Sequence, residues 1–232
     1  MEIHEALYTT RMMRRLRPDP IPLDTQARIL DAAVRAPNGG NTQRWHFVAV
    51  DDRELIREFA RLFREARALE YEKFRTGQGP MVTPAPGADP AAHAETMRRI
   101  KGSGDYLADH FDEVPLLLFV FAIDDLGGAN IYPAIWSVLL AARAEGVGGV
   151  MTMVLNNFRD RVNELLGVPI EEGWKMSAML TLGYPRGKWA VAANRLPVHE
   201  VSSRNRWDAP FGLEVPRPLW PPHETAELPA AG

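Results

Sequence analysis

Apolar residues recur along this chain at two spacings, and each spacing predicts a different element. In four segments they lie three and four positions apart, which predicts helices because such positions share one helix face. These segments are 23–36, 53–74, 130–145 and 158–166. Short apolar runs rich in β-branched and aromatic residues predict strands over 45–50, 115–123, 149–155 and 177–182. Helices and strands follow one another without strict βαβ alternation, which favours an α+β fold.

Two of these segments indicate how they are packed. The run 115–123 is apolar at both alternations, as expected of a strand that is covered on both faces. Segment 130–145 has no charged residue before Arg143. A helix that is apolar all round is buried, so this one is predicted to lie in a central core or at a subunit interface.

Two further segments lack a core pattern. Residues 76–90 are rich in glycine and proline, which predicts a long loop; a lid over a binding site and a disordered segment both fit it. Residues 184–232 are rich in proline and must either fray or lie on another surface. We therefore expect one domain over 1–209, with a variable lid region at 76–110 and an extended proline-rich arm at 210–232.

Charge and composition exclude several classes of protein. The 232 residues carry a formal net charge of −3, which argues against nucleic-acid or anionic-membrane binding because both favour a strongly basic surface. The longest apolar runs fall short of the roughly 20 residues needed to cross a bilayer, and the N-terminus lacks the apolar segment of a signal peptide. The expected location is the cytoplasm. The absence of cysteine excludes disulfides, thiolate metal ligands and a cysteine nucleophile.

Several catalytic motifs are missing from the chain. It contains no G-x-G-x-x-G after a strand and no G-x-x-x-x-G-K-[ST], which argues against a Rossmann dinucleotide site and a Walker loop. It has no G-x-S-x-G elbow, and its histidines form no H-x₃-H pair. Acyl transfer, NTP hydrolysis and zinc chemistry are therefore disfavoured, and no metal site is expected.

The arginine segment, residues 9–17, is the first candidate for ligand chemistry. Arg11, Arg14 and Arg15 are three and four positions apart, so on a helix they share one face. Guanidinium groups pair with phosphate oxygens through two parallel hydrogen bonds, so such a face would bind an anion. The alternative is a solvated basic face near the N-terminus that pairs with Glu2 and Glu5.

The amide bend, residues 37–43, joins a predicted helix to a predicted strand. Pro37 is expected to end the helix, and Gly39 and Gly40 permit backbone conformations that other residues avoid. Three side-chain amides surround the glycines and suit the edge of a heterocycle, because they both donate and accept hydrogen bonds. They belong to Asn38, Asn41 and Gln43. The alternative is an ordinary capped turn.

Together the two segments resemble the N-terminal signature of the nitroreductase family. R-M-M-R-R-L, P-D-P-I-P and A-P-N-G-G-N-T-Q-R-W stand here in order, with about twenty residues between the two main blocks. The family typically has R-R-S-x-R-x-F, a proline-containing link and A-P-S-G-x-N-x-Q-P-W. The chain departs from this pattern: Thr10 stands at the first arginine, Met12 and Asn38 stand where serine is common, and Arg44 where proline is common.

Two later segments resemble the same family. Residues 146–156 resemble the glycine-rich segment that runs beside the flavin ring, most of all in the iodotyrosine deiodinase and flavin destructase branches. The stretch from Asn194 through Arg195 to Pro197 resembles a C-terminal segment whose cation reaches the FMN phosphate or ribityl chain. The resemblance covers about residues 5–205.

This resemblance implies a fold, a cofactor and a site. The fold is α+β, with a mixed central sheet flanked by helices in an intertwined homodimer and FMN at the subunit interface. The arginines would neutralise the phosphate, the amide bend would hold the ribityl chain and the pyrimidine edge, and the main chain of 148–153 would run beside the reactive ring nitrogen. The arginine segment and the amide bend are expected to converge around one mononucleotide. The implied cofactor-binding residues are Arg11, Met12, Arg14, Arg15, Pro37, Asn38, Gly39, Asn41, Gln43, Gly148, Gly149, Met151, Thr152, Met153 and Arg195.

The implied activity is ping-pong hydride transfer from NADH or NADPH to a small nitro-, quinone- or related acceptor. The flavin carries that chemistry, so no side chain is named as catalytic. Reductive dehalogenation, oxygen-dependent flavin cleavage and non-catalytic flavin binding are the alternatives. The cleavage branch usually has an acidic residue in its arginine motif, where Met12 or Met13 stands here. Residues 68–110 are the expected substrate cover, in which Tyr71, Lys73 and Lys101 would engage a carboxylate as in the deiodinase branch.

Overall fold

The computed structural model describes residues 1–76, 89–191 and 195–221. The chain divides into two compact units. The larger unit consists of residues 11–188 and contains the whole sheet. The smaller unit combines residues 1–10 with the described part of 189–232.

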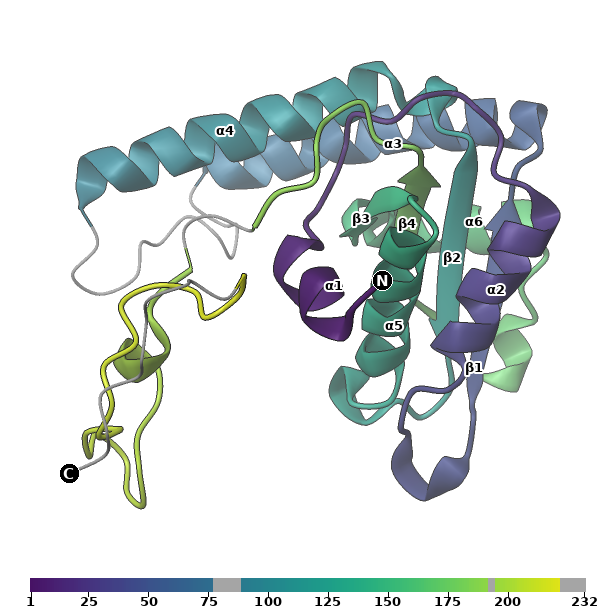
Figure 1. The fold of residues 1–232 in the computed structure, drawn as a ribbon. Helices are drawn as coiled ribbons and strands as arrows, with labels where there is room; N and C mark the ends of the chain where they lie inside the picture. Colours follow the sequence, from purple (N-terminus) through teal and green to yellow (C-terminus); the bar gives the residue numbers. More distant parts are fainter. Residues whose placement is uncertain (77–88, 192–194, 222–232) are drawn as a thin grey trace. The chain divides into compact units, whose positions relative to one another are not determined.

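A four-stranded sheet forms the centre of the larger unit, in the order β1-β2-β4-β3 (Figure 1). The α+β class and the four predicted strands are confirmed. Within the described residues all three ladders are antiparallel, so the parallel part of the predicted mixed sheet is reduced to one bridge, between Met12 and Gly149. The strands are β1 Trp45–Val50, β2 Leu116–Ala122, β3 Gly148–Thr152 and β4 Lys175–Gly183.

Strand β2 is buried along its whole length, as its double alternation predicts. Its even-numbered residues, among them Leu118 and Val120, pack in one cluster with α2 (Leu23–Ala33) and α5 (Ile131–Ala144). Side chains alternate between the faces of a strand, so Phe119 points the other way. Its ring centroid lies 4.6 Å from that of Phe59 in α3 (Arg53–Arg75). The sheet is therefore covered by helices on both faces, with α2 and α5 in front of it in Figure 1.

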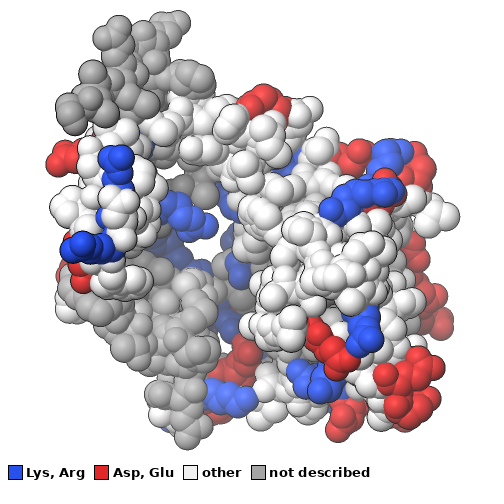
Figure 2. Space-filling model, turned by 90° about the horizontal axis from the view of Figure 1, so that it is seen from below, with Lys and Arg blue, Asp and Glu red and all other residues white. Residues whose placement is uncertain are grey.

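Helix α5 is the segment that was expected to be buried or to lie at an interface. Ile131, Ala134 and Val138 are fully buried against the sheet. Tyr132 and Trp136 are 39% and 38% exposed, and their four-residue spacing places them on one stripe. The helix thus belongs to the core on one side and leaves two aromatic rings uncovered on another. Seen from below, the right-hand part of the molecule shows a broad area without charged groups, which gather around it (Figure 2).

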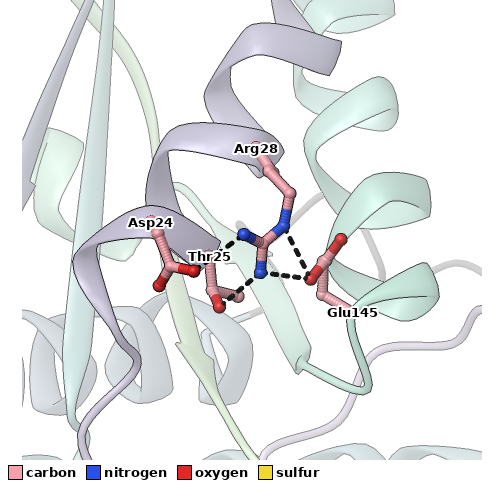
Figure 3. A network of polar contacts seen from close by, with 4 residues as sticks. All are labelled: Asp24, Thr25, Arg28 and Glu145. Carbon is pink, nitrogen blue, oxygen red and sulfur yellow. Dashed lines mark hydrogen bonds and ion pairs between the residues drawn. The ribbon is translucent and has the colours of Figure 1, made fainter.

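Helices α2 and α5 are also joined by a polar network at the surface (Figure 3). Arg28 donates hydrogen bonds to Asp24 at 2.8 Å and to Thr25 at 2.9 Å within α2, and to Glu145 at 2.9 Å directly after α5. The hydrogen bond to Glu145, followed by the one to Asp24, raises the pKa of Arg28. Because the side chains of Arg28 and Asp24 are more than half exposed, we expect the network to orient the two helices rather than to add much stability.

The other predicted helices are present with small differences. Helix α2 ends at Ala33, so Pro37 follows the helix and does not terminate it. Helix α3 runs one residue beyond the predicted end, and α6 (Arg159–Leu166) ends at Gly167, which takes a left-handed conformation at φ 62°. Most of the predicted glycine- and proline-rich loop, at 77–88, lies outside the described residues.

Helix α4 (Pro90–Asp109) was not predicted from the sequence and occupies much of the expected lid region. Asp89 caps it by accepting hydrogen bonds from the first backbone amides. Gly102 and Gly104 lower its helix propensity, and charged residues interrupt its apolar stripe. These two features obscure the apolar periodicity of the segment in the sequence, whereas in the structure α4 packs along α3 (Figure 1).

The smaller unit brings the two ends of the chain together. Helix α1 (Ile3–Thr9) carries Tyr8, whose ring centroid lies 5.8 Å from that of Trp220. Val215 is buried, and its N–H donates to His199 Nδ1 at 3.0 Å. Part of the predicted arm therefore packs within this unit, while 222–232 lie outside the described residues. Among the described helices, none has both the length and the apolar character required to span a bilayer.

Candidate functional site

The arginine segment is extended rather than helical, so the predicted helix face is wrong. Helix α1 ends at Thr9, and the following residues bond to other parts of the sheet. The N–H of Met13 donates to Gly149 O at 2.8 Å, and that of Arg17 donates to Tyr184 O at 2.8 Å. In the other direction, Arg186 N–H donates to Arg15 O at 2.9 Å. The segment is therefore fixed by main-chain hydrogen bonds to the edge strand β3 and to the chain after β4.

One turn of α4, residues 103–106, gathers three guanidinium groups. Arg14 Nη1 donates to Ser103 Oγ at 3.4 Å. Arg15 lies over the ring of Tyr106, 4.3 Å from its centroid. Arg67, from α3, lies 3.5 Å from Asp105. Although the segment is extended, it still brings Arg14 and Arg15 to one place. Together with Arg67 they form a cationic group that we call the guanidinium cluster.

Arg67 is the member of this cluster that sequence reasoning missed. Its side chain is only 15% exposed, and its buried Nε has no hydrogen-bond partner among the described residues. Burial, and next the charge of Arg67, lower the pKa of Arg14. Two adjacent, half-buried cations repel each other unless an anion lies between them. In the sequence, Arg67 is one of many charges on an amphipathic helix, and no local pattern marks it.

Gly104 leaves the space that Arg67 occupies. A Cβ at this position would lie 2.5 Å from Arg67 Nη2 and 2.9 Å from its Cζ. These atoms are too close for any side chain larger than hydrogen, so the guanidinium would have to move. At Gly102, two residues earlier, a Cβ would meet nothing within 4 Å. The position of Arg67 in the cluster therefore depends on glycine at position 104 and not on glycine at position 102.

Among the described residues, the other two cations predicted to bind the phosphate, Arg11 and Arg195, have no contact with this turn of α4, and their contact with a phosphate stays a prediction. Arg11 is exposed and donates to Lys188 O at 2.7 Å, at the end of the larger unit. Arg195 is exposed and belongs to the smaller unit.

The amide bend is a strained turn held from within and from α5. Gly40, Asn41 and Gln43 take left-handed conformations with φ of 61°, 51° and 52°. Asn38 Oδ1 accepts from the N–H of Gln43 at 2.9 Å, and Asn130 Oδ1 accepts from that of Gly39 at 2.7 Å. The side chains of Asn41 and Gln43 remain exposed, as does Pro37. Strain of this kind is typical of backbone that is shaped for a ligand.

The arginine segment and the amide bend do not converge within one chain. The bend leads into Trp45, which pairs with Ala122 at one end of the sheet. The arginine segment bonds next to Gly183 and Leu116, at the other end. The six residue steps along β2 correspond to about 20 Å. The expectation that both segments of one chain hold one mononucleotide is therefore wrong.

Edge strand β3 runs from the arginine segment toward the middle of the sheet. Gly149 O faces outward to Met13, and because strand hydrogen bonds alternate, the N–H of Met151 faces the same outer edge. The Met151 side chain packs on the core. Thr152 Oγ1 accepts from the N–H of Val154 at 3.2 Å, so its hydroxyl proton is free to donate. Met153 is half-exposed, and its sulfur accepts from the Tyr132 hydroxyl at 3.5 Å.

Glycines permit the close approach of β3 to β4. A Cβ on Gly149 would lie 2.3 Å from Thr181 O and 2.7 Å from a methyl carbon of Leu182. Gly148, beside it, is likewise buried and pairs with Gly183. The outer edge of β3 is thus flat main chain, with an outward N–H close to the guanidinium cluster. Such an edge suits a planar ring carried by an anionic group.

An α+β sheet with this edge strand and its flanking arginine segment is the core of a nitroreductase fold, and the chain belongs to the nitroreductase family, whose pattern it matches over residues 7–184. The family predicted from the sequence is confirmed. The chain is 34% identical over 201 residues to 5,6-dimethylbenzimidazole synthase of Rhodospirillum rubrum, covering 78% of this chain and 82% of that protein. It is 25% identical over 195 residues to iodotyrosine deiodinase 1 of Rattus norvegicus, covering 79% of this chain and 62% of that protein.

A solved structure confirms the fold. The FMN-dependent nitroreductase NfnB from Mycobacterium smegmatis, in complex with NADPH, superposes with a TM-score of 0.65 at 20% identity. The superposition covers 88% of this chain and 97% of that one. At this identity the likeness concerns the fold, and the ligands of that protein do not transfer by themselves.

Proposed function

We propose that the protein is an FMN-dependent oxidoreductase that passes hydride from NADH or NADPH to a small acceptor. The observation that carries this proposal is the guanidinium cluster at residues 103–106, directly beside the outward-facing edge of β3. Family membership supports the flavin, and the NADPH complex of a structural neighbour supports the nicotinamide donor.

The described residues fit FMN as an anionic, planar ligand. Arg14, Arg15 and Arg67 of the cluster, together with Arg11, would bind its phosphate and the electron-rich side of its ring, each charge-assisted hydrogen bond contributing about 1.5–3 kcal/mol when partly buried. The N–H of Met151 and the hydroxyl of Thr152 would donate to the ring. When bound, FMN supplies the two-electron chemistry, and the protein positions the ring, excludes water from it and stabilises negative charge on it. None of these roles requires a side-chain acid or base.

The amide bend requires a second copy of the chain. Because it lies at the opposite end of the sheet from the arginine segment, the bend of one protomer would reach the ligand held by its partner. The uncovered rings of Tyr132 and Trp136 on α5 supply apolar surface for such a homodimer, since aromatic residues are enriched at protein interfaces. Pro37, Asn38, Gly39, Asn41 and Gln43 would then bind the partner's flavin. The single 1–209 domain and the cytoplasmic location also stay predictions.

Anaerobic mixing tests the function. Purified protein loaded with FMN is expected to lose its yellow absorbance within one turnover on addition of NADH or NADPH, and to regain it on addition of a quinone or nitroaromatic acceptor. A protein that takes up no FMN would contradict the cofactor assignment. A protein that binds FMN but is not reduced by either nucleotide would be the non-catalytic flavin binder.

The similarity to 5,6-dimethylbenzimidazole synthase favours one second candidate, oxygen-dependent cleavage of the flavin. That branch usually carries an acid in its arginine motif, where Met12 or Met13 stands here, and this difference argues against the candidate. The same reduced protein exposed to air separates the two functions. A reductase returns all of its FMN in the oxidised form, whereas a cleaving enzyme consumes it.

Replacing Gly104 by alanine is expected to weaken FMN binding about tenfold without loss of stability. The new Cβ would displace the Arg67 guanidinium and remove about one charge-assisted hydrogen bond. Alanine also raises helix propensity by up to about 1 kcal/mol, so urea unfolding should shift to higher concentration, if at all. Gly102→Ala is the matched control, with the same gain in propensity and unchanged FMN affinity. If the two variants bound FMN with equal affinity, Arg67 would not be part of the FMN site.

A further inference from the structure

A cavity of about 420 Å³ lies between α3 and α4, next to the guanidinium cluster. Its volume falls in the range of small-molecule sites. Its apolar wall is formed by Tyr71 of α3 and by Met97 and Ile100 of α4. Arg67 belongs both to this wall and to the cluster at 103–106, so the cavity and the cluster are continuous. We call this cavity the α3–α4 pocket.

The charged groups in the wall of the α3–α4 pocket have one sign. Arg67 and Lys101 stand at its inner end, and Arg75 and Arg98 at its outer end. Among the described residues that line it there is no carboxylate. The acids that pair with these cations lie outside the wall: Asp105, for example, is 2.6 Å from Lys101 and 3.5 Å from Arg67. A ligand in the pocket therefore meets cations, apolar groups, the Tyr71 ring and His93, and no carboxylate of the described lining residues.

The inner end of the pocket combines a cation with an aromatic face. Lys101 Nζ lies over the ring of Tyr71, 4.9 Å from its centroid. Asp105 pairs with both Lys101 and Arg67, and Glu70 lies 3.9 Å from Arg67, so two carboxylates compensate these two cations. Half-buried Arg14 adds a further positive charge. The inner end thus favours a negative charge, and the wall beyond it favours a ring.

Lys73 does not belong to this group. Its Nζ donates to Asn157 at 2.7 Å, and the residue does not line the pocket. Of the three residues predicted to engage a carboxylate, Tyr71 and Lys101 therefore line the pocket and Lys73 does not. Arg67 lines the pocket in addition to them. The described residues that line the pocket include no acid to hold an ammonium group, so they match the carboxylate of an amino-acid zwitterion but not its ammonium.

We infer that the α3–α4 pocket binds the electron acceptor, and that this acceptor is a small aromatic monoanion, such as an aromatic carboxylate without an ammonium group. Its carboxylate would lie at Arg67 and Lys101, and its ring against Tyr71, Met97 and Ile100. Reduction of this ligand rests on the proposed flavin function, whereas its binding to the pocket does not. With a nitro acceptor, one nitro group, one NAD(P)H and one proton yield a nitroso group, NAD(P)⁺ and water.

The first test compares acceptors of the FMN-loaded protein with NADH or NADPH in excess. 4-Nitrobenzoate is expected to show a kcat/KM at least about tenfold above that of neutral nitrobenzene and of zwitterionic 4-nitrophenylalanine, because one charge-assisted hydrogen bond is worth about a factor of ten or more. In Lys101→Met this preference should disappear through a higher KM for 4-nitrobenzoate. Arg99→Met is the matched control on the same helix, because Arg99 pairs with Glu95 and does not line the pocket.

The second test needs no electron transfer. Calorimetric titration with 4-hydroxybenzoate should show binding to the FMN-loaded wild type and to Arg99→Met, and binding at least about tenfold weaker to Lys101→Met. No preference for 4-nitrobenzoate, or a preference that survives in Lys101→Met, would overturn the inference while flavin reduction stands. Binding of 4-hydroxybenzoate without reduction of the flavin by either nucleotide would support the pocket and reject the proposed function.

Discussion

Replacing Arg11 and Arg14 together by alanine is expected to yield a folded protein whose affinity for FMN is lower by at least about 100-fold. Each guanidinium supplies a charge-assisted hydrogen bond of about 1.5–3 kcal/mol, and every 1.4 kcal/mol corresponds to a factor of ten. The side chain of neither residue is needed to fix the arginine segment, which is bound to Gly149 and Tyr184 by main-chain hydrogen bonds. Quenching of FMN fluorescence measures the affinity, and circular dichroism checks the fold.

Arg17→Ala is the control for this double variant. Arg17 belongs to the same segment, but its guanidinium lies over the ring of Tyr184, 5.3 Å from the centroid, and within 3.4 Å of Asp19. Its removal should leave FMN affinity within about a factor of two. Unchanged flavin content in the double variant would show that the anion site is elsewhere. An equal loss of FMN affinity in Arg17→Ala would show that the effect comes from the change in net charge and not from contacts of Arg11 and Arg14.

Gly149→Ala is expected to destabilise the protein by about 3 kcal/mol and to abolish flavin binding. The added Cβ would lie 2.3 Å from a backbone oxygen, Thr181 O, which cannot move aside as a side chain can. Overpacking of this kind costs about 1–3 kcal/mol, and occasionally more, because β3 must separate from β4. The shift would also loosen the hydrogen bond from Met13, and with it the arginine segment. Urea unfolding and FMN titration measure the two effects.

The matched control is Gly187→Ala, at a glycine after β4. A Cβ there would meet nothing within 4 Å, and its backbone is not left-handed. Its stability should stay within about 0.5 kcal/mol of the wild type, as is usual for surface changes. A Gly149→Ala protein with wild-type stability and flavin content would mean that β3 and β4 lie further apart than described.

Much of the fold follows from patterns that are local in the sequence. The run 115–123 is apolar at both alternations, and β2 is indeed covered on both faces, by α2 and α5 on one side and by α3 on the other. Segment 130–145 has no charged residue before Arg143, and one side of α5 is buried against the sheet. These predictions hold because burial acts on each side chain according to its own polarity, and the period of the pattern reports which face is buried.

For the arginine segment, the local pattern predicted the wrong structure. Spacings of three and four residues suited a helix, yet the segment is extended because its main chain bonds to Gly149 and Tyr184. Those partners are more than 130 residues away in the sequence, so no local pattern carries the information. Helix α4 was missed for the same reason: its glycines weaken its own propensity, and α3 stabilises it.

The sequence by itself determined the family, the α+β class, the four strands of the sheet, and the two segments that carry arginines and amides. Only the tertiary structure decided how they combine. It placed the two segments at opposite ends of the sheet, joined Arg67 to Arg14 through one turn of α4, and opened a cationic pocket between α3 and α4. The physical reason is that polarity and propensity belong to single residues and short windows, whereas the field at a site is the sum of charges that chain folding brings together.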